Sequence, residues 1–224
     1  AAILKAAKVE AWTWLRAPEV ERVVACKGYD LEHRTIYGTA IFTGLREGEI
    51  WALRWVNVTL DGDAPEVFVC ESHDGPPKNG RTRRVPLLPR AVEMLRAWRA
   101  TFPRELADDA LVFPGESGGR RGESDDARWS PQTKWTRKDG TESAVAGYRL
   151  RAGVTRRVRF HDLRHTCASH LLQGTWGVTL MLMEVRDWLG HTSIKQTERY
   201  AHLCHDRLAA RVARDSRGGR SEER

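Results

Sequence analysis

A β-rich block at residues 55–87 interrupts a chain whose other patterns are helical, and it restricts the folds open to these 224 residues. The segments WVNVTL, EVFVCES and RTRRVPL alternate β-forming residues, and KNGR predicts a tight turn because Asn79 and Gly80 favour positive φ. Apolar residues at helical spacing precede the block and resume after Pro89. We therefore expect an α+β fold that is mainly α-helical, with a small three-stranded antiparallel sheet.

Proline and glycine mark the expected ends of helices. Pro18 suits the first turn of a helix, Gly44 ends a helical run, and Gly190 follows a helix predicted for residues 178–189. The SIKQ sequence at 193–196 fits a capping box and predicts another helix, with Tyr200 near its far end. Residues 115–159 are rich in Gly, Ser and mixed charge, so we expect a long surface loop there.

Composition narrows the class of protein. No run of about 18 apolar residues is present, so no membrane span is expected, and the opening residues do not fit a secretion signal. The four cysteines are scattered without a C-x-x-C pair, which favours a reducing, intracellular setting.

The positive charge of the chain is concentrated in one region. The formal net charge is +7, and residues 120–164 hold twelve Lys and Arg against six Asp and Glu. A concentrated basic surface attracts polyanions such as nucleic acids. A solvated basic loop explains the same composition equally well.

The HDLRHTCASHLL stretch, residues 161–172, gathers cationic donors. Helical geometry places His161, Arg164 and His165 on one side and Cys167 and His170 on the other. Such a surface suits a phosphate, because guanidinium groups match its oxygens and histidine donates a hydrogen bond or moves a proton. The alternatives are a solvated polar face or a metal site, for which His161 and His165 or the adjacent His161 and Asp162 are candidate ligands. No further carboxylate supply is visible close by, so no metal or other cofactor is expected.

Six positions, taken together, resemble the catalytic domain of the tyrosine recombinase, or phage integrase, family. They lie in TGLREGEI, KNGRTRRVPL, HDLRH, LGH and TERYAHL, and they are Arg46, Lys78, His161, Arg164, His191 and Tyr200. The resemblance runs from Pro18 to Leu208 and is weakest in residues 115–159. It implies a linker remnant at 1–17, a catalytic domain at 18–210 and a flexible tail at 211–224.

The resemblance implies covalent chemistry on DNA. Tyr200 would attack a phosphodiester and form a 3′-phosphotyrosyl bond, which conserves the bond energy for resealing. Arg46 and Arg164 would hold the nonbridging oxygens. Lys78 would protonate the departing 5′-oxygen, and His161 would accept or hold the tyrosine proton. The remaining catalytic position, His191, would donate a hydrogen bond to a phosphate oxygen.

The resemblance also implies supporting residues. Glu49 would orient Arg46 or His161, although a simple helix-surface pair with Arg46 explains it equally well, and His165 would have a secondary role. The arginines of the third strand would follow the DNA backbone, unless they form a solvated strand face. These arginines are Arg81, Arg83 and Arg84.

The implied function is site-specific recombination that integrates or excises a phage or mobile element in the cytoplasm of a bacterial host. The implied partner is double-stranded DNA, with a homo-tetramer on DNA for a longer protein and a monomer for this chain alone. A type IB topoisomerase shares most of this chemistry, and a DNA-binding regulator shares the scaffold without the chemistry. A metal-dependent nuclease is a further alternative, and EDTA would abolish its DNA cleavage.

Overall fold

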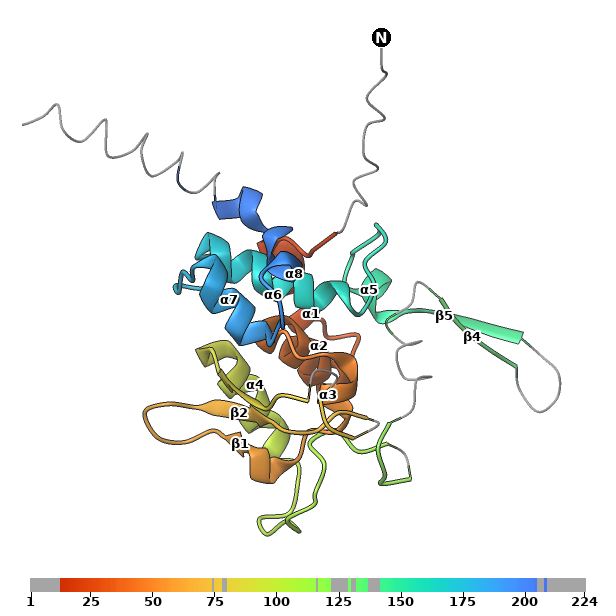
Figure 1. Cartoon of the computed structure of the whole chain (residues 1–224). Helices are drawn as coiled ribbons and strands as arrows, with labels where there is room; N and C mark the ends of the chain where they lie inside the picture. Colours follow the sequence, from red (N-terminus) through yellow and green to blue (C-terminus); the bar gives the residue numbers. More distant parts are fainter. Residues whose placement is uncertain are drawn as a thin grey trace, which may run out of the picture.

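The computed structural model describes residues 13–73, 75–77, 80–115, 117–121, 129, 132–136, 142–204 and 208. Helices α1 (Ala17–Val24), α2 (Leu31–Thr43) and α3 (Glu47–Trp51) come first, and α6 (Asp162–Gln173), α7 (Leu182–Leu189) and α8 (Lys195–Glu198) come last. Figure 1 shows α6 and α7 on one side of α2, and the small sheet with α4 (Pro89–Arg99) on the other. Among the described residues, no helix is long and apolar enough to cross a membrane.

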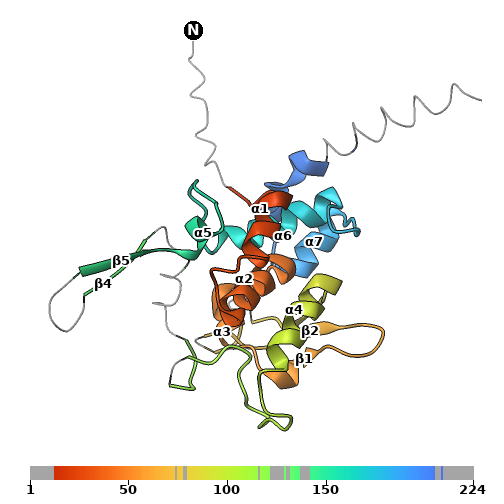
Figure 2. The ribbon, with the colours of Figure 1, turned by 180° about the vertical axis from the view of Figure 1, so that it is seen from behind.

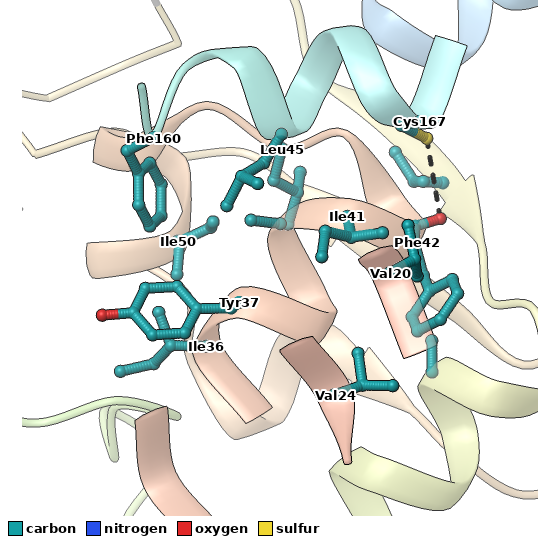
Figure 3. Packing of buried hydrophobic residues seen from close by; sticks show 14 of the residues in the cluster. Val20, Val24, Ile36, Tyr37, Ile41, Phe42, Leu45, Ile50, Phe160 and Cys167 are labelled. Carbon is teal, nitrogen blue, oxygen red and sulfur yellow. Dashed lines mark hydrogen bonds between the residues drawn. The ribbon is translucent and has the colours of Figure 1, made fainter. Parts of the chain in front are cut away.

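Helix α2 is the centre of the core because it contacts α1, α4 and α6. Its start is capped by Asp30, whose carboxylate accepts a hydrogen bond from the His33 backbone N–H at 2.8 Å. It ends at Gly44, which has the positive φ of 66° that favours glycine. Side chains are buried on every side of the helix, and Figure 3 shows Tyr37 and Ile41 packed among residues of neighbouring elements.

The expected three-stranded antiparallel sheet is confirmed. Strands β1 (Val58–Thr59), β2 (Glu66–Val69) and β3 (Arg83–Pro86) pair in that order, with Val67 opposite Val85. Val67 and Val85 face the core, whereas Arg84, the residue before Val85 on β3, is exposed. The WVNVTL segment is strand only at its end, since Trp55–Asn57 form a 3-10 turn.

The expectation of a long surface loop at 115–159 is wrong for the residues that the structure describes. Strands β4 (Gln132–Thr136) and β5 (Glu142–Ala146) form an antiparallel hairpin, and helix α5 (Tyr148–Arg151) follows it. Figure 2 shows the hairpin reaching away from the helical body. Trp129 is 2% exposed, its indole N–H donates to the Val158 carbonyl at 2.8 Å, and its ring packs 4.8 Å from that of Tyr37. Buried aromatic surface therefore anchors a segment whose composition suggested a loop.

The C-terminal helices are shorter than expected. Helix α7 begins at Leu182 rather than near Val178, because the Glu184 carboxylate accepts a 2.6 Å hydrogen bond from the Met181 backbone and fixes the start there. Helix α8 spans only Lys195–Glu198 and ends before Tyr200. The segment HDRLAARVARD lies mostly outside the described residues.

Candidate active site

Arg46 and Glu49 stand at the start of α3, and two hydrogen bonds join Arg46 to the Glu49 carboxylate. Arg46 is the residue before the helix, and its backbone N–H donates to Glu49 Oε2 at 2.8 Å. Its guanidinium also donates to Glu49 Oε1 at 2.9 Å. The Glu49 side chain is fully buried, so this is not the simple helix-surface pair that the spacing alone allowed.

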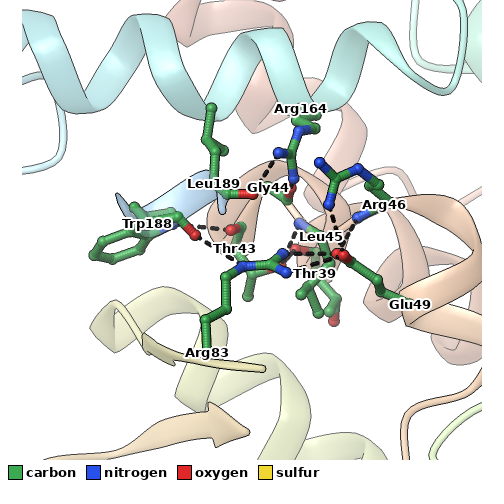
Figure 4. Close-up of polar contacts among 10 residues, drawn as sticks. All are labelled: Thr39, Thr43, Gly44, Leu45, Arg46, Glu49, Arg83, Arg164, Trp188 and Leu189. Carbon is green, nitrogen blue, oxygen red and sulfur yellow. Dashed lines mark hydrogen bonds and ion pairs between the residues drawn. The ribbon is translucent and has the colours of Figure 1, made fainter. Parts of the chain in front are cut away.

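Arg83 reaches the same carboxylate from strand β3. Its Nη1 and Nη2 donate to Oε1 and Oε2 of Glu49 at 2.9 and 2.7 Å, as Figure 4 shows. Burial alone would raise the pKa of Glu49, but the hydrogen bonds and charge of Arg83, followed by the Arg46 N–H, lower it to about 2. The sequence predicts that Arg83 follows the DNA backbone, whereas the structure leaves its side chain 10% exposed and engages its donors inside the protein.

Arg164 joins the segments that hold the two other phosphate-binding candidates. From α6, its Nη1 donates to the Gly44 carbonyl at 2.6 Å and its Nη2 donates to the Leu189 carbonyl. These carbonyls lie two residues before Arg46 and two residues before His191, respectively. Burial, followed by the charge of Arg46, lowers the pKa of Arg164 to about 9, so it remains positive at neutral pH.

His191 follows the glycine that ends α7, and it contacts the next helix. Its Nδ1 lies 2.8 Å from the Thr197 hydroxyl. The Thr197 carbonyl in turn accepts a hydrogen bond from the Tyr200 backbone N–H at 3.0 Å. Burial, followed by the charges of Arg164 and Arg46, lowers the pKa of His191 to about 3, which keeps it neutral.

Tyr200 lies inside the protein, against helix α6. It is 1% exposed, and its hydroxyl is 2.5 Å from Nδ1 of His165. Burial raises the pKa of Tyr200 to about 12, while burial followed by the charge of His161 lowers that of His165 to about 4. His165 is therefore neutral at pH 7, so its Nδ1 can accept a hydrogen bond from the phenol.

His161 occupies the position just before α6 and is exposed to solvent. Its ring lies 5.3 Å from that of His165, measured between centroids, in an edge-to-face arrangement. Partial burial of the ring, followed by the charge of Arg164, lowers the pKa of His161. The hydrogen-bond partner of the Tyr200 hydroxyl is thus His165, one helical turn away from His161, the histidine that the sequence favoured.

The remaining basic positions lie away from this cluster or outside the described residues. Lys78 and Asn79 lie outside the described residues. Arg81 is exposed, and Arg84 is an exposed side chain paired with Glu66. Arg81, which precedes β3, and Arg84, which lies on it, are thus accessible to a polyanion.

Helix α6 has no solvated polar face. Arg164 and His165 are buried, and so are Cys167 and His170 on the opposite side. The His170 ring bonds to the Leu15 carbonyl at 2.9 Å and stacks on Trp176. Several polar side chains of this helix are bonded within the protein, among them Arg164, His165 and His170.

Within the described ranges, the group of side chains suited to holding a metal ion lies elsewhere. Asp30, Glu32 and His33 form it at the start of α2. Asp30 caps the helix and Glu32 pairs with Arg121, so both carboxylates have structural partners.

The sequence did not predict two contacts in the site, that of Arg83 with Glu49 and that of Thr197 with His191. Arg83 was assigned to DNA, and only the pairing of β3 brings it to Glu49. Thr197 was not singled out, although its place three residues before Tyr200, one helical turn, was a usable signal.

Comparison with known sequences places this arrangement in a family. Residues 13–207 match the sequence model of the phage integrase family. Tyrosine recombinase XerC of Xanthomonas campestris pv. campestris (strain B100) is 30% identical over 181 residues, which cover 80% of this chain and 47% of that protein. XerC of Xylella fastidiosa (strain 9a5c) is 31% identical over 173 residues, covering 77% and 49%. The chain spans about half the length of the curated relatives it matches.

Solved structures share the fold. The crystal structure of XerA recombinase superposes with a TM-score of 0.65 at 22% identity, covering 91% of this chain and 65% of that one. XerH recombinase bound to its palindromic difH substrate gives 0.61 at 21%, covering 90% and 53%. The catalytic domain of bacteriophage HP1 integrase gives 0.54 at 20%, covering 90% and 94%. The match to the family model over most of the chain, together with the XerC identities, shows that this protein belongs to the phage integrase family of tyrosine recombinases.

Proposed function

We propose that this chain carries the DNA-cleaving and rejoining centre of a site-specific recombinase. The observation that supports this most is the position of Arg164, which bonds to the backbone beside both Arg46 and His191. Preorganised cationic and neutral donors of this kind stabilise the charge of a phosphoryl transition state without having to rearrange. Tyr200 supplies a nucleophile on the segment that follows His191.

The proposed reaction is a transesterification. The Tyr200 oxygen bonds to the phosphorus, the bond to the 5′-oxygen breaks, and the products are a 3′-phosphotyrosyl DNA end and a free 5′-hydroxyl. The phenolic proton passes to His165, whose Nδ1 contacts the hydroxyl in this structure and has to stay within hydrogen-bond reach when Tyr200 becomes accessible to DNA. The departing 5′-oxygen takes up one proton, and Lys78 is the proposed donor. Rejoining reverses these steps and consumes no nucleotide cofactor.

Arg46 and Arg164 are assigned to the nonbridging oxygens, and His191 is assigned to a hydrogen bond with the phosphate. Losing one such donor typically slows catalysis by about 10² to 10³. His161 is assigned to a water-facing supporting role, since it is exposed beside His165. It would relay the proton that His165 accepts.

Tyr200 has to move before it can meet DNA. A side chain that is 1% exposed cannot present its hydroxyl to the backbone of a duplex. The segment that carries α8 and Tyr200 would therefore shift when DNA binds, and α8 itself is a single turn of helix, Lys195–Glu198. DNA binding and nucleophile release are coupled in this proposal.

The substrate class and assembly extend the same proposal. Double-stranded DNA is the proposed partner, consistent with the difH complex of XerH, a fold relative. A homo-tetramer on DNA is proposed for a protein as long as the curated relatives, and a monomer for this chain alone. Integration or excision of a phage or mobile element is the narrower form of the proposal, and the XerC relatives support the broader recombinase class.

The test uses nicked DNA duplexes whose sequence around the nick is randomised, so that cleavage beside the nick releases a short fragment and traps the covalent product. We expect the unmodified chain to give an adduct that survives denaturation, with mass spectrometry locating the DNA on Tyr200. Tyr200→Phe should abolish the adduct. Tyr148→Phe is the matched control, because it removes a phenol hydroxyl bonded to Asp30, outside the site.

Other outcomes would favour other functions. Binding without any adduct would favour a regulator that lacks the chemistry. Cleavage that disappears with EDTA would favour a metal-dependent nuclease. Relaxation of supercoiled plasmid, together with adduct formation that shows no preference among the randomised sequences, would favour a topoisomerase.

A further inference from the structure

We infer that Arg83 is a positioning residue of the cleavage reaction: it orients Glu49 and, through Glu49, the guanidinium of Arg46. This inference rests on the proposed function. Arg83 lies on β3, a strand that otherwise serves the small sheet. Its N–H groups donate to Glu49 and to the Trp188 carbonyl, whereas the neighbouring Arg84 pairs with Glu66.

The Glu49 carboxylate is shared evenly by two arginines. Oε1 accepts from Arg83 Nη1 and Arg46 Nη1, both at 2.9 Å. Oε2 accepts from Arg83 Nη2 at 2.7 Å and from the Arg46 backbone N–H at 2.8 Å. The parallel two-point contact with Arg83 fixes the plane of the carboxylate. The direction in which Arg46 is held follows from that plane.

Charge gives Arg83 a second effect. Without it, the buried Glu49 would neutralise Arg46, and a phosphate would meet a pair with no net charge. With it, two guanidinium groups share one carboxylate, and one positive charge remains for the DNA. The pair of contacts to Arg83 is deep in the protein, where such charges are weakly screened.

Arg83 also reaches the end of α7. Its Nε donates to the Trp188 carbonyl at 3.2 Å, next to the Leu189 carbonyl that Arg164 holds. It packs against Gly190, where a Cβ atom would lie 2.8 Å from Arg83 Cδ. Figure 4 shows Arg83 crossing from β3 between Trp188 and Glu49. One side chain thus ties together β3, the start of α3 and the residues just before His191.

The experiment measures single-turnover adduct formation on a nicked duplex with which the unmodified chain forms the adduct. It compares four variants: Arg83→Met, Arg83→Lys, Glu49→Gln and the Arg83→Met/Glu49→Gln double variant. We expect Arg83→Met to slow adduct formation by about 10²-fold, as small displacements of a reacting group do, with a smaller change in affinity for the duplex. Arg83→Lys keeps the charge and loses the fork, so it should recover part of the rate. The double variant should be no slower than the slower single variant, since both changes act on one carboxylate.

Arg90→Met is the matched control. It removes an arginine from an exposed ion pair with Glu93 on α4, away from the site, and should keep the unmodified rate. Thermal unfolding monitors whether each variant is folded. If Arg83→Met does not fold, the test uses the rate of Arg83→Lys and compares it with the rate of the Arg83→Lys/Glu49→Gln double variant.

The inference is overturned if Arg83→Met forms the adduct as fast as Arg90→Met while the unmodified chain is active. It is also overturned if rate and affinity fall together and the effects of Arg83→Met and Glu49→Gln multiply, because Arg83 would then act on DNA directly. Absence of adduct from the unmodified chain itself is a different result. It refutes the proposed function, and the role inferred for Arg83 falls with it.

Discussion

The hydroxyl of Tyr200 lies 2.5 Å from Nδ1 of His165 in a part of the protein that solvent hardly reaches. The contact holds the proposed nucleophile inside the fold and supplies a proton acceptor at the same atom. A buried phenol with a pKa raised to about 12 by its burial is a poor nucleophile until such a base assists it.

Tyr200→Phe should destabilise the fold modestly, because the His165 ring nitrogen loses a buried partner. We expect the free energy of unfolding to fall by about 1 kcal/mol. Urea denaturation at pH 7 measures it. Tyr148→Phe loses a hydroxyl that bonds at 3.3 Å in a more exposed setting, so it should cost less. Equal stability of Tyr200→Phe and the unmodified chain would contradict the contact.

Acidification should weaken the fold through His165. Its pKa is lowered from 6.5 to about 4 by burial and then by the charge of His161, so the unfolded chain takes up a proton at a higher pH than the folded chain. The free energy of unfolding should therefore fall as pH drops from about 6.5 toward 4, by at most about 3 kcal/mol from this residue. Denaturation curves across that range test it. His165→Asn should reduce the dependence and leave the part that comes from His191, whose pKa is lowered to about 3.

Gly44→Ala should be costly for two reasons. The residue has a φ of 66°, and an added Cβ would lie 2.6 Å from Leu189 Cδ2 and 3.2 Å from Cys167 Cβ. We expect a loss of about 2 kcal/mol or more in the free energy of unfolding. Adduct formation should slow as well, because Arg164 bonds to the Gly44 carbonyl.

The matched control for that variant is Gly62→Ala. Gly62 also has a positive φ, 89°, but nothing lies within 4 Å of an added Cβ. It should show only the backbone cost of about 1 kcal/mol and no loss of adduct formation. Equal costs at the two glycines would show that the close approach of Leu189 does not matter.

Trp129→Ala should destabilise the whole domain, although the residue belongs to the stretch whose composition resembles a loop. Its ring is buried beside Tyr37 on the central helix, so truncation should cost about 3 to 5 kcal/mol. Thermal or chemical unfolding measures the cost. The exposed Val56→Ala should change the free energy of unfolding by less than about 0.5 kcal/mol. A neutral Trp129→Ala would mean that this segment does not anchor to the core.

Local patterns in the sequence were sufficient for much of the fold. Periodicity and glycine placed α1, α2 and α6, and alternation with a turn signal predicted the sheet and its antiparallel order. Composition failed at 115–159, because the buried Trp129 and the half-buried Tyr148 pack against Tyr37 of the core although most of their neighbours in the sequence are polar. The expected helix at 178–189 was too long, because Glu184 caps it at Met181.

The sequence by itself determined which residue types were available and in what order, including Arg46, Arg164, His191 and Tyr200 and the family that they resemble. Only the tertiary structure decided which of them meet. In the folded protein Arg83 binds Glu49. The Tyr200 hydroxyl contacts His165 rather than His161. The physical reason is that spacing along a strand or helix sets the side on which a residue lies, whereas its partner is set by whatever element packs against that side.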